Sequence, residues 1–176
     1  MWYYLFLTII ALGSQTISIF NFSHKAPLDR WQIVNDGVMG GLSKSSLELT
    51  EDGNGLFKGH VSIQNNGGFA SLRLPVDFKI NDEYQYIVLK VKGDGKTYQC
   101  RLKGSKNQAE SYVNEFKTSG EWQTIELKLK DFTPKFRGRS LNKPNFYFDK
   151  IEQFGILIAS KQEADFILLI DAIELK

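Results

Sequence analysis

Apolar and polar residues alternate along most of this chain, which is the pattern of β-strands buried on one face. The alternating runs place these residues on common faces: Phe57, Gly59, Val61 and Ile63; Ile87, Leu89 and Val91; Tyr98, Cys100 and Leu102; Ile125, Leu127 and Leu129; Phe154, Ile156 and Ile158; Phe166, Leu168 and Ile170. No stretch keeps a helical period over three turns. Many short strands without intervening helices predict an all-β fold, an antiparallel β-sandwich or barrel.

The connections between these runs are predicted from glycine, asparagine and proline. Residues 51–55 contain two glycines and predict a hairpin turn. Residues 93–95 predict the turn that returns the chain from residues 87–91 to residues 98–102. Pro75 is expected to end the strand that begins at Phe69, because proline cannot donate to a sheet ladder.

Two glycine-rich loops are the candidate functional elements. The first spans residues 34–43 and the second residues 65–73, and each combines glycine with asparagine or aspartate. Glycine permits turns with positive φ, and Asn or Asp fixes a turn by bonding its own backbone. Two well-made turns in a β protein are one interpretation, and a binding surface is the other. The candidate residues are Asn35, Asp36, Gly37, Met39, Gly40 and Gly41 in the first loop and Asn66, Gly67, Gly68 and Arg73 in the second.

Arg73 shares a strand face with Phe69 and Ser71. A charge on a largely apolar face needs an ion pair or a ligand. Asp36 and Asp94 are its candidate partners.

Four motifs in order resemble the complex I intermediate-associated protein family. They are residues 34–43, residues 65–73, residues 92–98 with Asp94 and Tyr98, and residues 136–139 (Phe136-Arg137-Gly138-Arg139). The resemblance covers residues 19–176 and implies a jelly roll of the galactose-binding-like type. It also implies an assembly factor for NADH:ubiquinone oxidoreductase.

The charge is small overall and uneven along the chain. The net charge is +2, so the composition does not indicate a nucleic-acid binder. The segment from Lys128 to Lys143 holds six basic residues against Asp131 alone. This segment, expected to be irregular over residues 132–145, is either a solvated face or a docking surface. Phe132 and Phe136 beside Arg137 and Arg139 have the composition of a protein-binding hot spot.

The residues that often carry catalysis or bind metals do not form a recognisable site. His24 and His60 are far apart in the chain, and one cysteine with them does not give a metal-ligand spacing. Cys100 is expected in the core. The aromatic residues Trp31, Trp122, Tyr98, Tyr112 and Phe116 are either core or a sugar-stacking platform. We therefore expect no catalytic residues, no metal and no cofactor.

Two functions remain open from the sequence. The first is a non-catalytic, chaperone-like module that holds a protein client during assembly of the NADH dehydrogenase complex. The alternative is a carbohydrate-binding jelly roll outside the cytoplasm. Nucleic acid is not an expected partner, and membrane association is expected only through the N-terminal segment.

Residues 1–18 are interpreted as an apolar leader, and residues 19–176 as a single β-sandwich domain. The run from Trp2 to Leu12 is too short for a bilayer-spanning helix, which needs about 20 residues. Its length and the small residues after it suit a secretory signal, although no basic residue precedes it. An uncleaved anchor and a buried first strand are the alternatives. Export is favoured over a cytoplasmic or membrane-associated location.

We predict that the native protein is processed between Gly13 and Ser18, because small residues follow the apolar run there. Mass spectrometry of the protein from its own cells, with each cell fraction measured separately, checks this. An intact Met1 in a soluble cytoplasmic fraction would contradict it.

Overall fold

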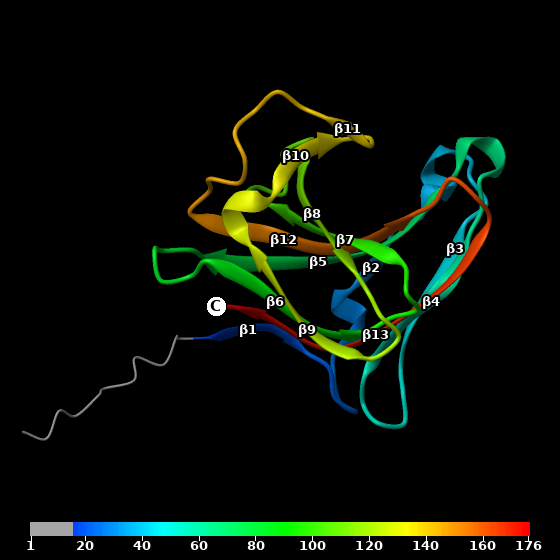
Figure 1. Ribbon diagram of the computed structural model, residues 1–176, viewed down its shortest axis with the longest axis horizontal. Coiled ribbons are helices and arrows are strands. Elements are labelled where there is room, and N and C mark those ends of the chain that lie inside the picture. The colour runs from blue at the N-terminus through cyan, green and yellow to red at the C-terminus, as the bar shows by residue number, and fades with distance from the viewer. Residues whose placement is uncertain (1–15) are drawn as a thin grey trace, which may run out of the picture.

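Two antiparallel sheets packed face to face make up the computed structural model, which describes residues 16–176 (Figure 1). Most of the apolar leader, residues 1–15, lies outside the described residues. One sheet contains β1 (Ile17–Asn21), β3 (Lys44–Leu49), β4 (Gly55–Val61), β6 (Tyr86–Lys92), β9 (Trp122–Lys128) and β13 (Ala164–Leu175). The other contains β2 (Gln32–Ile33), β5 (Phe69–Lys79), β7 (Thr97–Lys103), β8 (Ser111–Lys117), β10 (Thr133–Phe136), β11 (Arg139–Ser140) and β12 (Lys150–Ala159).

The strand order places β13 and β12, the last two strands of the chain, inside the two sheets. The six-stranded sheet runs β3-β4-β13-β6-β9, with β1 also paired to β13. The seven-stranded sheet runs β11-β10-β8-β7-β12-β5-β2. Helical structure in the described residues is confined to four single 3-10 turns, η1 (Leu28–Arg30), η2 (Asp36–Met39), η3 (Gln64–Asn66) and η4 (Leu129–Asp131). The prediction of an all-β antiparallel sandwich is confirmed.

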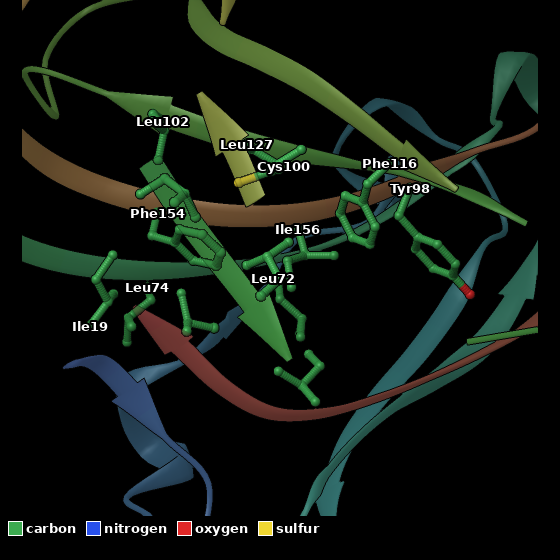
Figure 2. Close-up of a cluster of buried hydrophobic side chains, with 14 of the residues drawn as sticks. Ile19, Leu72, Leu74, Tyr98, Cys100, Leu102, Phe116, Leu127, Phe154 and Ile156 are labelled. Carbon is green, nitrogen blue, oxygen red and sulfur yellow. The ribbon is translucent and has the colours of Figure 1, made fainter. Parts of the chain in front are cut away.

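The core lies between the two sheets and is built from the alternating residues of the sequence. Leu72, Cys100 and Phe154 come from neighbouring strands of the seven-stranded sheet and point into the cluster that Figure 2 shows. Burial raises the pKa of the Cys100 thiol, so this cysteine is a core residue. Trp31 makes edge contacts with Phe20 and Phe154, at 5.3 and 6.2 Å between ring centroids, and so links β1 to β12.

Of the five aromatic residues left open between core and a sugar-stacking platform, four belong to the core. Trp31, Tyr98, Tyr112 and Phe116 are buried, whereas Trp122 is 42% exposed. Ile63 lies beyond the end of β4 and is also exposed, so its predicted place on the inner face is wrong.

Pro75 does not end its strand, contrary to expectation. β5 continues through Pro75 to Lys79. Pro75 lies opposite Gln153, next to a register shift in the ladder with β12, and beyond the residues that β2 covers. A bulge beside an uncovered edge tolerates the missing backbone donor.

The turn at residues 93–95 connects the two sheets and does not form a hairpin. β6 belongs to the six-stranded sheet and β7 to the seven-stranded sheet. Alternation alone does not distinguish a hairpin within one sheet from a connection between two sheets, because each strand has an apolar face in both.

The segment 132–145 is more ordered than expected, because it contains β10 and the short β11. These two strands form a hairpin that extends the seven-stranded sheet beyond β8 (Figure 1). None of the helical turns in residues 16–176 has the length or hydropathy that crossing a membrane requires.

Candidate functional site

A cleft of about 690 Å³ lies on the outer face of the seven-stranded sheet. Its floor is formed by outward-facing residues of β5, β12 and β7, and its ends by the β4–β5 loop and the β10–β11 hairpin. Six of the predicted candidate residues line it: Asn66, Gly67, Gly68, Arg73, Phe136 and Arg137. The fold therefore brings together residues from two separate sequence motifs, residues 65–73 and residues 136–139.

The loop end of the cleft is held by the buried carboxylate of Asp36. Its Oδ1 accepts a hydrogen bond from the Ser43 amide at 3.0 Å, and its Oδ2 accepts from the Ser43 hydroxyl. The same Oδ2 accepts from the amides of Gly68 at 2.7 Å and Phe69 at 3.2 Å. Asp36 is 1% exposed, so this one carboxylate joins the two glycine-rich loops below the surface.

Burial on its own would raise the pKa of Asp36, but these hydrogen bonds hold it below the usual value. Each bond favours the charged form of the carboxylate. Asp36 is therefore a structural anion and not a partner of Arg73.

The glycines beside Asp36 divide into two kinds. Gly40 has a φ of 88° and ends η2, and Gly68 has a φ of 136°, so both adopt backbone conformations that favour glycine. A β-carbon at Gly41 or Gly67 would instead lie within 2.7 Å of the Asp36 side chain. The prediction that these loops contain positive φ is confirmed, and the close approach of the Asp36 side chain accounts for glycine at Gly41 and Gly67.

The other residues of the first loop lie outside the cleft. Asn35 accepts a hydrogen bond from the Ser45 hydroxyl at 2.8 Å, and Gly37 lies in η2. Met39 is the last residue of η2, and its side chain lies outside the described part of the structure. The second loop contacts the first again through Asn65, which donates to the Gly40 carbonyl at 3.2 Å.

The β12–β13 loop completes this end of the molecule. The Ser160 amide donates to the Gly68 carbonyl at 3.0 Å, and Glu163 accepts from the Ile63 amide at 3.0 Å. His60 is exposed and lies 2.7 Å from both Glu163 and Asp165. Hydrogen bonds to these carboxylates raise the pKa of His60.

The hairpin end of the cleft is formed by the predicted Phe136–Arg139 motif. Arg137 and Gly138 have φ values of 47° and 77°, as the two central residues of a type I′ turn require. The Arg137 guanidinium lies over the Phe136 ring at 5.4 Å, and Phe136 is 40% exposed. Arg139 pairs with Phe136 across the hairpin and is exposed. Phe132 is fully buried, so its predicted place beside these arginines on the surface is wrong.

The floor of the cleft carries a row of cations that the sequence motifs only partly indicate. Gly155 of β12 lies opposite Arg73 of β5 on one side and Arg101 of β7 on the other. Lys103 follows two residues after Arg101 and therefore projects from the same face of β7. In the described residues none of these three has a carboxylate within 4 Å, so the predicted pairing of Arg73 with Asp36 or Asp94 is wrong.

Neutral groups bond two of these cations. Arg101 donates to the Gln99 side-chain oxygen at 3.0 Å, and Lys103 donates to the Gln108 carbonyl at 2.7 Å. Burial, with the neighbouring Arg73 charge, lowers the pKa of Arg101 to about 10. Burial also lowers the pKa of Arg73. An arginine stays protonated at neutral pH, so the cost of burying these charges is retained in the folded protein.

Asp94 is a structural residue of the β6–β7 turn, as the turn prediction implied. Its carboxylate accepts from the Tyr98 hydroxyl at 3.0 Å, from the Ile167 amide at 3.1 Å, and from Lys96. Burial and the Asp94 charge raise the pKa of Tyr98. Asp94 thus ties the β6–β7 turn to β13 and does not line the cleft.

Sequence reasoning missed Arg101, Lys103 and Gly155. The first two alternate with the core residues Tyr98, Cys100 and Leu102, so the basic outer face of β7 was visible in the sequence. Gly155 was not, because its role depends on which strands flank β12. Within residues 16–176 no three His, Cys, Asp or Glu side chains are placed to hold a metal ion.

Comparisons with known proteins identify the family and the fold. A sequence model described as Complex I intermediate-associated protein 30 (CIA30) matches residues 20–170. The mitochondrial Complex I intermediate-associated protein 30 of Drosophila melanogaster is 28% identical over 86% of this chain and 59% of its own length. The Mus musculus protein of the same name is 24% identical over 88% of this chain and 54% of its own length. The chain thus spans little more than half of these relatives.

Solved structures of carbohydrate-binding modules share the fold. The family 11 carbohydrate-binding module of a cellulosomal cellulase of Clostridium thermocellum superposes with a TM-score of 0.68 at 13% identity, covering 93% of this chain and 95% of its own. The same kind of module in complex with a β-1,3-1,4-mixed-linked tetrasaccharide gives a TM-score of 0.62 at 14% identity, covering 87% and 91%. At these identities the likeness shows the fold alone, and it confirms the predicted jelly-roll sandwich.

We predict that Asp36→Asn lowers the free energy of unfolding by about 2–3 kcal/mol at pH 7, because a neutral amide cannot accept all four hydrogen bonds. The folded-state pKa of Asp36 is depressed, so its contribution is present above the unfolded value and is lost as pH falls through the folded pKa. The difference between wild type and variant should therefore shrink below about pH 4. Urea denaturation across pH, with the exposed Asp77→Asn as control, measures both effects.

We predict that Arg101→Gln raises the free energy of unfolding by about 1 kcal/mol and the melting temperature by roughly 2–4 °C, because it removes a partly buried charge without a carboxylate partner. Calorimetry measures the change. The control is Lys44→Gln, an exposed position on β3 that should change stability by less than about 0.5 kcal/mol. A loss of stability in Arg101→Gln would show that the guanidinium holds the sheet together.

Proposed function

This chain belongs to the Complex I intermediate-associated protein 30 family, and we propose that it is a non-catalytic module that binds a protein client during assembly of the NADH dehydrogenase complex. The client lies in the cleft on the outer face of the seven-stranded sheet. Residues 19–176 form the binding domain in this proposal, and the leader 1–18 determines where the module works.

One observation carries the proposal: the cleft is lined by two of the four family-like motifs, residues 65–73 and residues 136–139. Asn66, Gly67 and Gly68 form one end, Arg73 lies on the floor, and Phe136 with Arg137 forms the other end. The first loop is not a contact surface in this reading. Asp36, Gly40 and Gly41 instead position the second loop at the cleft, and Asn35 bonds Ser45 of β3.

The hairpin gives the cleft the character of a protein-binding surface. The exposed ring of Phe136 supplies apolar area, and the Arg137 guanidinium over it supplies a planar group that pairs with carboxylates. The type I′ turn holds both side chains at the tip, so little ordering is needed on binding.

A carbohydrate ligand is the second candidate, because a module with the same fold has been solved with a bound tetrasaccharide. The lining residues favour a protein. Among the described residues the cleft is lined by the aromatic side chains of Phe69 and Phe136 but by no Trp or Tyr. Its floor is charged, whereas a neutral sugar has no group that compensates an unpaired cation.

We predict that the double variant Arg137→Asn, Arg139→Gln folds normally and lowers the recovery of NADH dehydrogenase subunits with the protein. Asparagine suits the positive φ of Arg137, so the turn is kept while the guanidinium over Phe136 is lost. The measurements are co-precipitation with antibodies to known subunits, and native gels of the assembled complex in a gene-deletion strain complemented with each variant.

The matched control removes the same charge elsewhere. Lys25→Gln, Lys44→Gln changes two exposed lysines outside the cleft and should restore assembly like the wild type. Normal assembly of the NADH dehydrogenase complex in the deletion strain without a complementing gene would refute the proposed function. A mixed-linked glucan that binds the wild-type protein, with assembly unaffected in every strain, would establish the carbohydrate candidate.

A further inference from the structure

The cleft floor holds three partly buried cations that have no carboxylate partner among residues 16–176. Eight other lysines have a carboxylate within 4.0 Å: Lys58, Lys90, Lys92, Lys96, Lys135, Lys143, Lys150 and Lys176. Lysines without such a partner, such as Lys25 and Lys44, are exposed to water. Arg73, Arg101 and Lys103 are less exposed and lack such partners in residues 16–176. Unpaired charges are expected to be fewest where burial makes them most costly, so this arrangement points to a ligand.

The carboxylates nearest to the floor are already bonded. Glu115 accepts from Gln99 at 3.2 Å and pairs with Lys135 at 3.2 Å. Glu110 pairs with Lys143 at 2.6 Å. A side-chain rearrangement that neutralised the floor would break these pairs at the rim.

Gly155 leaves room between the two guanidinium groups. Arg73 and Arg101 lie on the strands either side of it, about 10 Å apart at their α-carbons by strand spacing. A β-carbon at Gly155 would approach the Leu72 carbonyl at 3.0 Å and the Arg101 β-carbon at 3.8 Å. The long arginine side chains can therefore converge over a floor without a side chain, and their planar forks suit a carboxylate held by two parallel hydrogen bonds.

We propose that Arg73 and Arg101, either side of Gly155, form a subsite for a carboxylate of an acidic, extended segment of the client. This inference rests on the proposed function and names the chemistry that the cleft recognises. Lys103 receives the next acidic side chain, because residues two apart on an extended segment repeat every 6–7 Å or so, like Arg101 and Lys103 on β7.

The remaining lining favours a peptide over a small anion. Phe69, Leu157 and Ala159 line the cleft beside the cations and offer apolar contacts. An extended segment with acidic residues at every second position, followed on the same face by an apolar residue, can contact both parts of the floor. A free phosphate or an acidic sugar uses the cations alone.

The test uses the full chain and two defined probes: a rhodamine-labelled octapeptide in which Glu and Leu alternate, and the same peptide with Gln at each Glu position. Fluorescence anisotropy should show that the Glu peptide binds at least about tenfold more tightly than the Gln peptide. Arg73→Gln, Arg101→Gln should weaken binding of the Glu peptide by about tenfold or more, without loss of melting temperature. Arg101→Lys keeps the charge but not the fork and should give a smaller loss.

The control Lys25→Gln, Lys44→Gln should leave the affinity of the Glu peptide unchanged. Equal affinities for the two peptides, or an unchanged affinity in the arginine double variant, would overturn the subsite. Tighter binding of an oligoglucuronate than of the Glu peptide would overturn the peptide as occupant. The peptide-binding results do not depend on the assembly assay. If the protein binds the Glu peptide but the NADH dehydrogenase complex assembles normally in the deletion strain, only the proposed function is refuted.

Discussion

The buried carboxylate of Asp36 is the contact on which the cleft depends. It lies in the first glycine-rich loop, yet two of its hydrogen-bond donors, Gly68 and Phe69, belong to the start of β5. An ionised group that is 1% exposed is stable only when its lone pairs are satisfied. The glycines around Asp36 make this possible, because they let the backbone amides approach the carboxylate closely. The position of the second loop, and with it one end of the cleft, follows from this one anion.

The two charged centres of the protein differ in how their burial is compensated. Asp36 is surrounded by donors that favour its charged form, so its pKa is lowered even though burial opposes this. Arg101 has one neutral acceptor and a neighbouring cation, and burial lowers its pKa. The first arrangement stabilises the fold. The second costs stability in the unliganded protein, and a cost of this kind at a cleft indicates that the group is kept for a partner.

Much of the fold was predictable because alternation reports which face of a strand is buried. The inner faces of β6, β7, β12 and β13 were all identified in this way. Alternation does not report which sheet a strand joins, which is why the crossing at residues 93–95 was taken for a hairpin. The prediction that Pro75 ends its strand was wrong, because a proline interrupts a strand only where a neighbouring strand needs a backbone N–H donor at that position.

The candidate site was predictable where local backbone chemistry defines it and not where strand order does. Gly40, Gly68 and the Arg137-Gly138 turn have the positive φ values that their residue types suggested. The partner of Arg73 was predicted wrongly, because Asp36 and Asp94 are fully engaged by amides and hydroxyls. The neighbours of Arg73 across β12 are Gly155 and Arg101, and only the register of three strands reveals them.

The same sandwich serves proteins with unrelated ligands, so the outer face of the sheet has to be interpreted from its own side chains. The solved modules that resemble this chain share its fold at 13–14% identity, and that likeness shows the fold alone. In this protein the floor is a row of cations around a glycine, with phenylalanines at the two ends. A ligand there has to supply negative charge at the centre and apolar area beside it. An extended peptide with acidic residues at every second position and an apolar residue beside them on the same face does so with the repeat of a single strand, which makes the client's own sequence the feature that the cleft selects.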